Sequence, residues 1–448
     1  MSQDRPRRLC WIYGCLGLSL SWLVVGAMNS LAEPPSGATR SATAAEEATG
    51  NRPEGVLSWR HCNLTEDEYA RRAEAWEAWS RAHPSDVRAL VEWGRALRYV
   101  GGHRSEVDSL FAEAFSADST DAVVIDAYAP RVWLSESGGD DWALAHQRLL
   151  RAAREDSTYA DTYYVLWLTS LQVGDTTLAR HCLDRVVELG DMPAPLLDFG
   201  YNLLASAPPS AIVFTNGDND TYPPLALQAR LGFRRDVSIV NVSLLNLPWY
   251  IRRAREAGVP LDLNDAAIAA LKATPERSIS AQAQLAMAQA VAKASVPRPV
   301  CYATTVGSTD AIPGDRVLEG LVWRVLPPGG CGEKGTTPCF DLARTRDLFD
   351  TLYRLDSATD PLLDWSRENS VARLAPNYAT LLYKVGDGLL SRSPREEGGP
   401  YLYKALKILA FHAGTRGAAN LREEILQTWT AKDPGSVWLT EAKKLTAR

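Results

Sequence analysis

Hydrophobic positions recur at helical spacing in two parts of the chain, residues 59–195 and 341–448. In the first part, helix pairs repeat at a spacing of about 35 residues, with turns at Gly101-Gly102 and at Gly174-Asp175. A single pair of this kind leaves one apolar face uncovered, so successive pairs are expected to stack. The pattern therefore predicts an all-α repeat domain, followed later in the chain by a second helical domain.

Residues 196–340 have a different pattern, in which short apolar runs alternate with helical segments. Runs that are apolar throughout are typical of parallel strands covered on both faces, and their alternation with helices predicts a doubly wound sheet. The expected fold is α/β plus all-α, with a small Rossmann-like parallel-sheet domain between helical repeats and C-terminal repeat-like helices. The four expected strands lie in SAIVFTN (210–216), VSIVNVSLL (237–245), PVCYATTVG (299–307) and VLEGLVWRVLP (317–327).

The N-terminal segment predicts export. Basic residues precede an apolar stretch at 9–27, and small residues follow it, as in a secretory signal that occupies residues 1–32. An uncleaved anchor that tethers the protein to a membrane is the alternative. Residues 33–58 are rich in Pro, Ser, Thr, Ala and Gly and are expected to form a disordered linker. Either alternative places the bulk of the protein outside the cytoplasm, periplasmic or secreted.

Charge and cysteine usage add two expectations. The net charge of −6 argues against a nucleic acid partner. In an oxidising compartment, Cys331 and Cys339 are expected to form a disulfide because they bracket a short loop. A zinc site there is the weaker alternative, since no histidine lies near.

The motif FTNGDND, residues 214–220, follows the first expected strand. The carboxyl ends of parallel strands meet at one edge of a sheet, and polar residues follow three of the strands here. Their carboxylate, amide and hydroxyl groups could orient sugar hydroxyls, or could hold Ca²⁺ or Mg²⁺ through Asp218 and Asp220. The candidate ligand-binding residues are Asn216, Asp218, Asn219, Asp220, Asn241, Asn246, Thr304 and Thr305.

A purely structural role for this motif has equal support from the sequence. Asp220 or Thr221 could cap a helix whose first turn holds Pro223 and Pro224. The single glycine and the lack of a lysine argue against a nucleotide cofactor, so no cofactor other than a cation is expected. All the histidines lie outside the sheet segment, which leaves no supplier for a histidine-based triad.

Two resemblances bear on function. The helical pairs resemble tetratricopeptide repeats in the placing of Trp93-Gly94, Gly174 and Ala179, which implies a surface for a protein partner or, alternatively, a spacer. Residues 201–253, with FTNGDND, VSLLN and WYI, resemble the extracytoplasmic domain of a bacterial family of polytopic membrane proteins related to protein O-mannosyltransferases. This resemblance continues at LEGLVWRVLP and NYATLLYKVGDGLL, and it implies a link to cell-envelope glycosylation.

The sugar-transferring membrane half of that family has no counterpart here, so no catalytic residue is carried over. The favoured hypothesis is an exported, non-catalytic binding or scaffold protein. Its repeats would hold a protein partner, and its GDND loop would bind a glycan, a glycosylated protein or a cation. The alternative is a sugar-acting enzyme, glycosyltransferase-related or a hydrolase, that uses Asp218 and Asp220.

Overall fold

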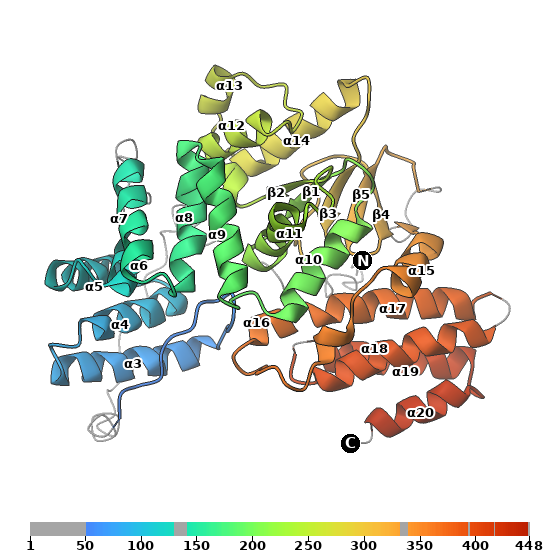
Figure 1. Ribbon diagram of the computed structural model, residues 1–448. Helices are drawn as coiled ribbons and strands as arrows, with labels where there is room; N and C mark the ends of the chain where they lie inside the picture. The colour runs from blue at the N-terminus through green and yellow to red at the C-terminus, as the bar shows by residue number, and fades with distance from the viewer. Residues whose placement is uncertain (1–50, 130–140, 332–338, 393–394, 416, 447–448) are drawn as a thin grey trace, which may run out of the picture. The chain divides into compact units, whose positions relative to one another are not determined.

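The computed structural model describes residues 51–129, 141–331, 339–392, 395–415 and 417–446 (Figure 1). The expected signal or anchor, and the linker as far as residue 50, lie outside the described residues. Within the described ranges, no helix is both long enough and apolar enough to cross a membrane.

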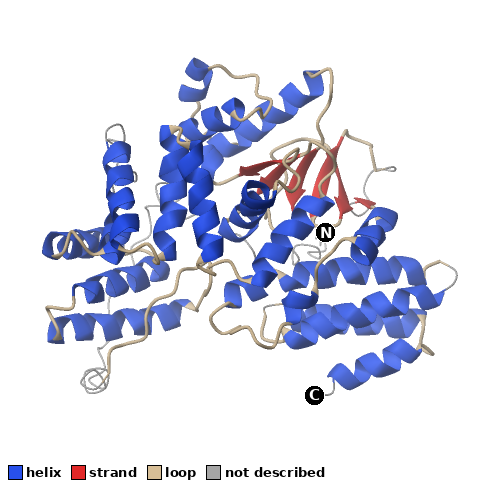
Figure 2. Ribbon diagram, viewed as in Figure 1, coloured by secondary structure: helices blue, strands red, loops and turns tan. Residues whose placement is uncertain are grey.

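The chain is mostly helical and divides into two compact units. The helical unit is Val25–Met192, described from residue 51, and the sheet unit is Pro193–Arg448. Every described strand belongs to the sheet unit, as Figure 2 shows.

The helical unit contains the helix pairs that the periodicity predicts. Pairs of consecutive helices pack together, among them α3 with α4, α4 with α5 and α8 with α9. Gly174 ends α8 in the left-handed conformation, with φ at 85°, which glycine adopts without steric cost. The helices are α3 (Glu66–Ala82), α4 (Val87–Val100), α5 (Arg104–Ala117), α6 (Ala122–Tyr128), α7 (Asp141–Glu155), α8 (Ala160–Val173) and α9 (Thr176–Glu188).

Residues 51–58, expected to belong to the linker, instead pack on this unit. Val56 is buried, with 6% of its surface exposed, within the same core as Trp76 and Phe111. Composition suggested a linker because these residues have few apolar neighbours in sequence, whereas their contacts come from helices that follow much later.

The sheet unit holds a six-stranded sheet in the order β2-β1-β3-β5-β4-β6. The strand β1 pairs in parallel with β2 and β3, β5 pairs antiparallel with β3 and β4, and β6 is parallel to β4. The strands are β1 (Ile212–Thr215), β2 (Ser238–Asn241), β3 (Val300–Ala303), β4 (Asp315–Glu319), β5 (Val322–Leu326) and β6 (Cys339–Phe340).

The sheet is mixed: the predicted parallel arrangement holds for β1, β2 and β3, whereas β5 is antiparallel to its neighbours, so a parallel sheet throughout is wrong and the Rossmann-like assignment is not confirmed. The run 317–327, expected to be one strand, contains most of a hairpin whose strands β4 and β5 reverse at Gly320 and Leu321. Gly320 has φ at 57°, and a Cβ atom there would collide with the Tyr353 hydroxyl. A tight hairpin needs only two connecting residues, so one continuous apolar run can hold two antiparallel strands.

Helices surround the sheet and form the C-terminal part of the same unit. A disulfide joins Cys331 to Cys339, where β6 begins, with the two Cα atoms 5.7 Å apart. The helices are α10 (Ala194–Ser206), α11 (Asp218–Leu231), η2 (Leu244–Asn246), α12 (Pro248–Glu256), α13 (Asp265–Ala269), α14 (Ile279–Lys293), α15 (Leu342–Thr351), η3 (Asp356–Thr359), α16 (Asn369–Ala372), α17 (Ala375–Leu390), η4 (Arg395–Gly398), α18 (Gly399–Phe411), α19 (Ala418–Lys432) and α20 (Val437–Thr446).

Candidate functional site

The carboxyl ends of β1, β2 and β3 meet at one edge of the sheet, and the polar segments that follow them bond to one another. The Thr221 hydroxyl lies 2.7 Å from that of Thr215 and accepts a hydrogen bond of 2.9 Å from the Asn241 amide. The Thr305 hydroxyl, after β3, donates to Asp220. We call this group the sheet-edge cluster. The strand order thus brings together the three segments that the sequence singles out.

Asp220 uses its carboxylate to hold its own loop. It is the third residue of α11, is 2% exposed, and accepts hydrogen bonds of 2.8 Å from the backbone amides of Asn216 and Gly217. Burial raises the pKa of the Asp220 carboxyl, although these amides and the Thr305 hydroxyl favour its charged form. Both carboxylate oxygens are therefore occupied by groups of the protein.

Two of the four candidate asparagines, Asn241 and Asn246, also hold the protein's own backbone. Asn241 is fully buried, and its Oδ1 accepts a hydrogen bond of 2.9 Å from the Leu244 amide. Asn246 donates to the Ser243 carbonyl at 3.1 Å and accepts from the Ser280 amide at 3.2 Å. These side chains fix the turn after β2 rather than face a ligand.

Asn216 contributes backbone groups to this edge, and its carbonyl accepts hydrogen bonds from Asn241 at 3.4 Å and Ser243 at 3.3 Å. The three other candidates have different surroundings. Asp218 and Asn219 are half-buried in the first turn of α11, where the helix dipole favours a negative charge. The Thr304 hydroxyl is buried and has no hydrogen-bond partner within the described part of the chain. Of the two aspartates, only Asp218 is partly accessible to a ligand.

The donor set at this edge does not fit a cation. Asp220 has both oxygens committed to hydrogen bonds within the protein, and Asp218 is the other carboxylate of the motif. Across the described ranges, no group of three or more His, Cys, Asp or Glu side chains could hold a metal ion. Hard cations such as Ca²⁺ are held by several oxygen ligands that include carboxylates, and this edge supplies no cluster of carboxylates among the described residues.

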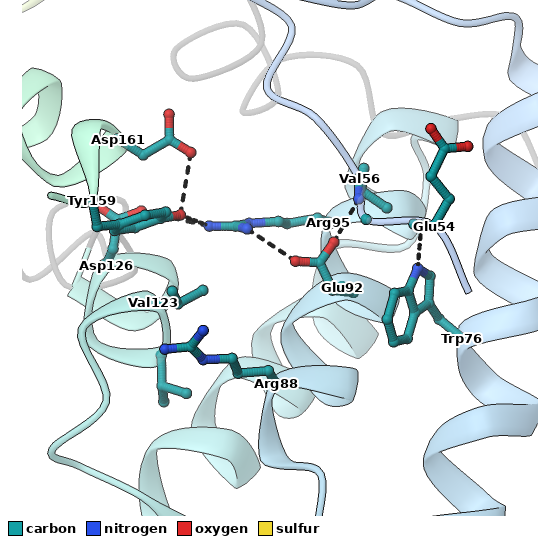
Figure 3. Close-up of polar contacts among 12 residues, drawn as sticks. Glu54, Val56, Trp76, Arg88, Glu92, Arg95, Val123, Asp126, Tyr159 and Asp161 are labelled. Atoms are coloured by element: carbon teal, nitrogen blue, oxygen red, sulfur yellow. Dashed lines mark hydrogen bonds and ion pairs between the residues drawn. The ribbon is translucent and has the colours of Figure 1, made fainter. Parts of the chain in front are cut away.

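A second polar region, which the sequence reasoning missed, lies on the helical unit. Residues 52–61 run along α3 and α4 without regular secondary structure, and we call them the N-terminal strap. The Val56 amide donates to Glu92 at 2.6 Å, and the Glu54 carbonyl accepts from the Trp76 indole at 3.1 Å (Figure 3). The strap is therefore held partly through its backbone.

The strap side chains contact residues of three segments. The Trp59 ring stacks on Tyr99 of α4, with centroids 4.7 Å apart. Arg60 pairs with Asp161 of α8, and its guanidinium lies 3.8 Å from the centre of the Tyr164 ring. His61 Nε2 lies 2.9 Å from a carboxylate oxygen of Asp191, after α9.

Beneath the strap, polar contacts connect α4 to the start of α8. Arg95 donates to Glu92 at 3.2 Å and to the hydroxyl of Tyr159, which in turn donates to Asp161 at 3.2 Å (Figure 3). Arg95 also lies 3.8 Å from Asp126 of α6. Burial raises the pKa of the Asp126 carboxyl, while the nearby positive charges of Arg95 and Arg60 lower it.

One sequence signal could have identified this second region. Glu92, Arg95 and Asp126 lie within otherwise apolar helical stretches, VEWGRAL and VVIDAY. Charged residues are rarely buried unless they are paired, so charges inside such stretches indicate an internal ion network.

Comparison with known proteins adds one family match. Residues 196–262 match the family TMEM260-associated domain 2. This match fits the protein O-mannosyltransferase-like family that the motifs resemble. It covers α10, β1, α11, β2 and α12, and therefore includes the sheet-edge residues from Asn216 to Asn246.

Other comparisons add little. No curated protein matches the sequence. Among solved structures, the crystal structure of the MamA protein is similar with 16% identity and a TM-score of 0.24, covering 47% of this chain and 91% of MamA. A second MamA crystal structure has the same identity and TM-score and covers 43% of this chain and 90% of MamA. With TM-scores this low, the likeness carries no argument about this protein.

Proposed function

We propose that this chain is an exported, non-catalytic binding or scaffold protein linked to protein glycosylation. Its helical unit would hold a protein partner, and the sheet edge at Asp218 and Asn219 would contact a glycan or glycosylated segment. The family match over residues 196–262 supports the link to glycosylation. One observation carries the non-catalytic assignment. The Asp220 carboxylate accepts hydrogen bonds from the backbone amides of its own loop.

The geometry disfavours the enzyme alternative. Glycoside hydrolysis uses two carboxyl groups that flank the scissile bond, about 5–10 Å apart. Asp218 and Asp220 lie in the same helical turn, and Asp220 points to amides inside the protein. A bond placed against Asp218 would not have the Asp220 carboxylate on its other side, because both Asp220 oxygens accept hydrogen bonds from the protein.

The test is thermal unfolding of the full chain with mannose-bearing glycopeptides, the unglycosylated peptides, Ca²⁺ and Mg²⁺. A ligand at about 100 times its Kd stabilises the folded state by about 2.7 kcal/mol, which raises the unfolding midpoint by several degrees. We expect this shift with a glycopeptide and its loss in Asp218→Asn.

A matched control is Asp265→Asn, because Asp265 is also the first residue of a helix in the same unit. We expect that variant to keep the glycopeptide shift. Sugar release or transfer by the wild-type chain that disappears in Asp218→Asn would instead identify an enzyme and refute the proposal.

A further inference from the structure

The N-terminal strap lies on the helical unit as an extended peptide lies on a receptor. Backbone groups of Glu54, Gly55 and Val56 bond to side chains of α3 and α4. Val56 is buried, Trp59 stacks on an aromatic ring, and Arg60 is held by a carboxylate and a ring face. Backbone hydrogen bonds combined with separate side-chain anchors are how proteins recognise extended peptides.

The charges on the two sides of this contact are complementary. The strap contributes Arg52, Arg60 and His61. The helical unit faces them with the carboxylates of Asp86, Asp161 and Asp191, and Glu92 accepts the Val56 amide. Without the strap, this acidic surface would lose every one of these partners, and a basic segment would be favoured in its place.

We propose that the surface formed by Asp86, Glu92, Tyr99, Asp161, Tyr164 and Asp191 is a peptide-binding site, and that the strap is its intramolecular occupant. Its partner is an extended, basic peptide segment with an aromatic residue directly before an arginine, the pattern of Trp59-Arg60. This inference rests on the protein-partner part of the proposed function and names the chemistry of that partner. It is independent of the glycan at the sheet edge.

The occupancy by the strap has a quantitative consequence. A segment joined to its site by a few residues has an effective concentration of about 1 mM. A free peptide with an intrinsic Kd of about 10 μM would therefore bind the intact chain about 100-fold more weakly than a chain with the strap displaced.

The experiment uses the fluorescent peptide RPEGVLSWRH, the sequence of residues 52–61, and fluorescence anisotropy with the full chain. In the variant Val56→Asp/Arg60→Ala, the strap loses a buried apolar side chain and the Arg60–Asp161 ion pair. We expect the peptide to bind this variant about 100-fold more tightly than the wild type. A peptide with alanine in place of its second arginine should bind at least about ten-fold more weakly, because the partner of Asp161 is missing.

Arg81→Ala is the matched control. Arg81 is also an arginine of the helical unit in an ion pair, but it lies outside the strap, pairs with Glu77 of its own helix, and is 68% exposed, against 13% for Arg60. Exposed pairs contribute little, so the strap should stay in place and the peptide affinity should equal that of the wild type.

Hydrogen exchange decides how a negative result is interpreted. If the amides of residues 54–61 in the double variant exchange quickly while α8 stays protected, the strap has left its site and the helical unit is intact. If the peptide then binds the variant no more tightly than the wild type, the inference is overturned and the strap is a structural element. If the double variant loses protection in α8, Arg60→Ala alone is tested by the same criterion. The glycopeptide shift at Asp218 is measured separately, so its failure would refute the glycan proposal without changing the peptide result.

Discussion

The sheet-edge cluster and the strap contact both enclose carboxylates, fully at Asp220 and partly at Asp161 and Asp191, but the hydrogen-bond partners come from different parts of the chain. Asp220 is bonded to amides three and four residues before it in its own loop. Asp161 and Asp191 are bonded to Arg60 and His61, which are 101 and 130 residues away in sequence. The first arrangement forms whenever the loop and α11 fold, whereas the second requires a separable segment to be in place. An acidic motif is therefore weaker evidence for a binding site than an acidic surface covered by a displaceable segment.

The largest expected effect separates the two aspartates of the motif. Asp220→Ala leaves two backbone amides, one of them buried, and the buried Thr305 hydroxyl without their acceptor, and we expect a loss of about 3–5 kcal/mol in the free energy of unfolding of the sheet unit. Asp218→Ala removes a half-buried charge in the first turn of a helix, which should cost about 0.5–1 kcal/mol.

Urea unfolding of both variants measures this difference. A larger loss in Asp218→Ala than in Asp220→Ala would reverse the assignment of the structural and accessible carboxylates.

The next effect concerns the strap contact and depends on pH. Burial alone would raise the pKa of the Asp191 carboxyl, but the hydrogen bond from His61 and the charges of Arg60 and His61 hold it below its usual range. Because the pKa is lower in the folded than in the unfolded protein, the stabilisation is present above about pH 4 and is lost as the pH falls through the folded-state value.

Asp191→Asn should therefore cost about 2 kcal/mol near pH 7 and make the helical unit less sensitive to acid. Hydrogen exchange of α8 and α9 amides between pH 7 and pH 3.5 measures both quantities. An unchanged acid dependence in the variant would show that the His61–Asp191 pair does not hold the strap.

The smallest effect is expected from two neighbouring threonines at the sheet edge. Thr305→Val removes a hydroxyl that donates to buried Asp220, so we expect a loss of about 1–2 kcal/mol. Thr304→Val replaces a buried hydroxyl that has no partner among the described residues, so the change should stay within about 0.5 kcal/mol. Urea unfolding compares the pair, and a larger loss for Thr304→Val would indicate that its hydroxyl has a partner in solution.

The sequence predicted the features that depend on neighbouring residues. Apolar spacing predicted helices on both sides of Gly101-Gly102 and of Gly174, and the apolar runs predicted β1, β2 and β3. These predictions succeed because the period of apolar positions reflects the local backbone geometry. The order of those strands was also enough to bring Asn216, Asn241 and Thr305 to one edge.

Tertiary structure alone decided the other features. The run at 317–327 became a hairpin because Gly320 reverses the chain against Tyr353, a residue supplied by a later segment. The choice between a capping and a ligand-binding role for Asp220 depended on where its oxygens point. Amino-acid composition could not predict the strap, because each of its anchoring side chains contacts a residue far along the chain. Local patterns determine which elements form, whereas hydrogen bonds and ion pairs between distant segments are fixed only when those elements pack.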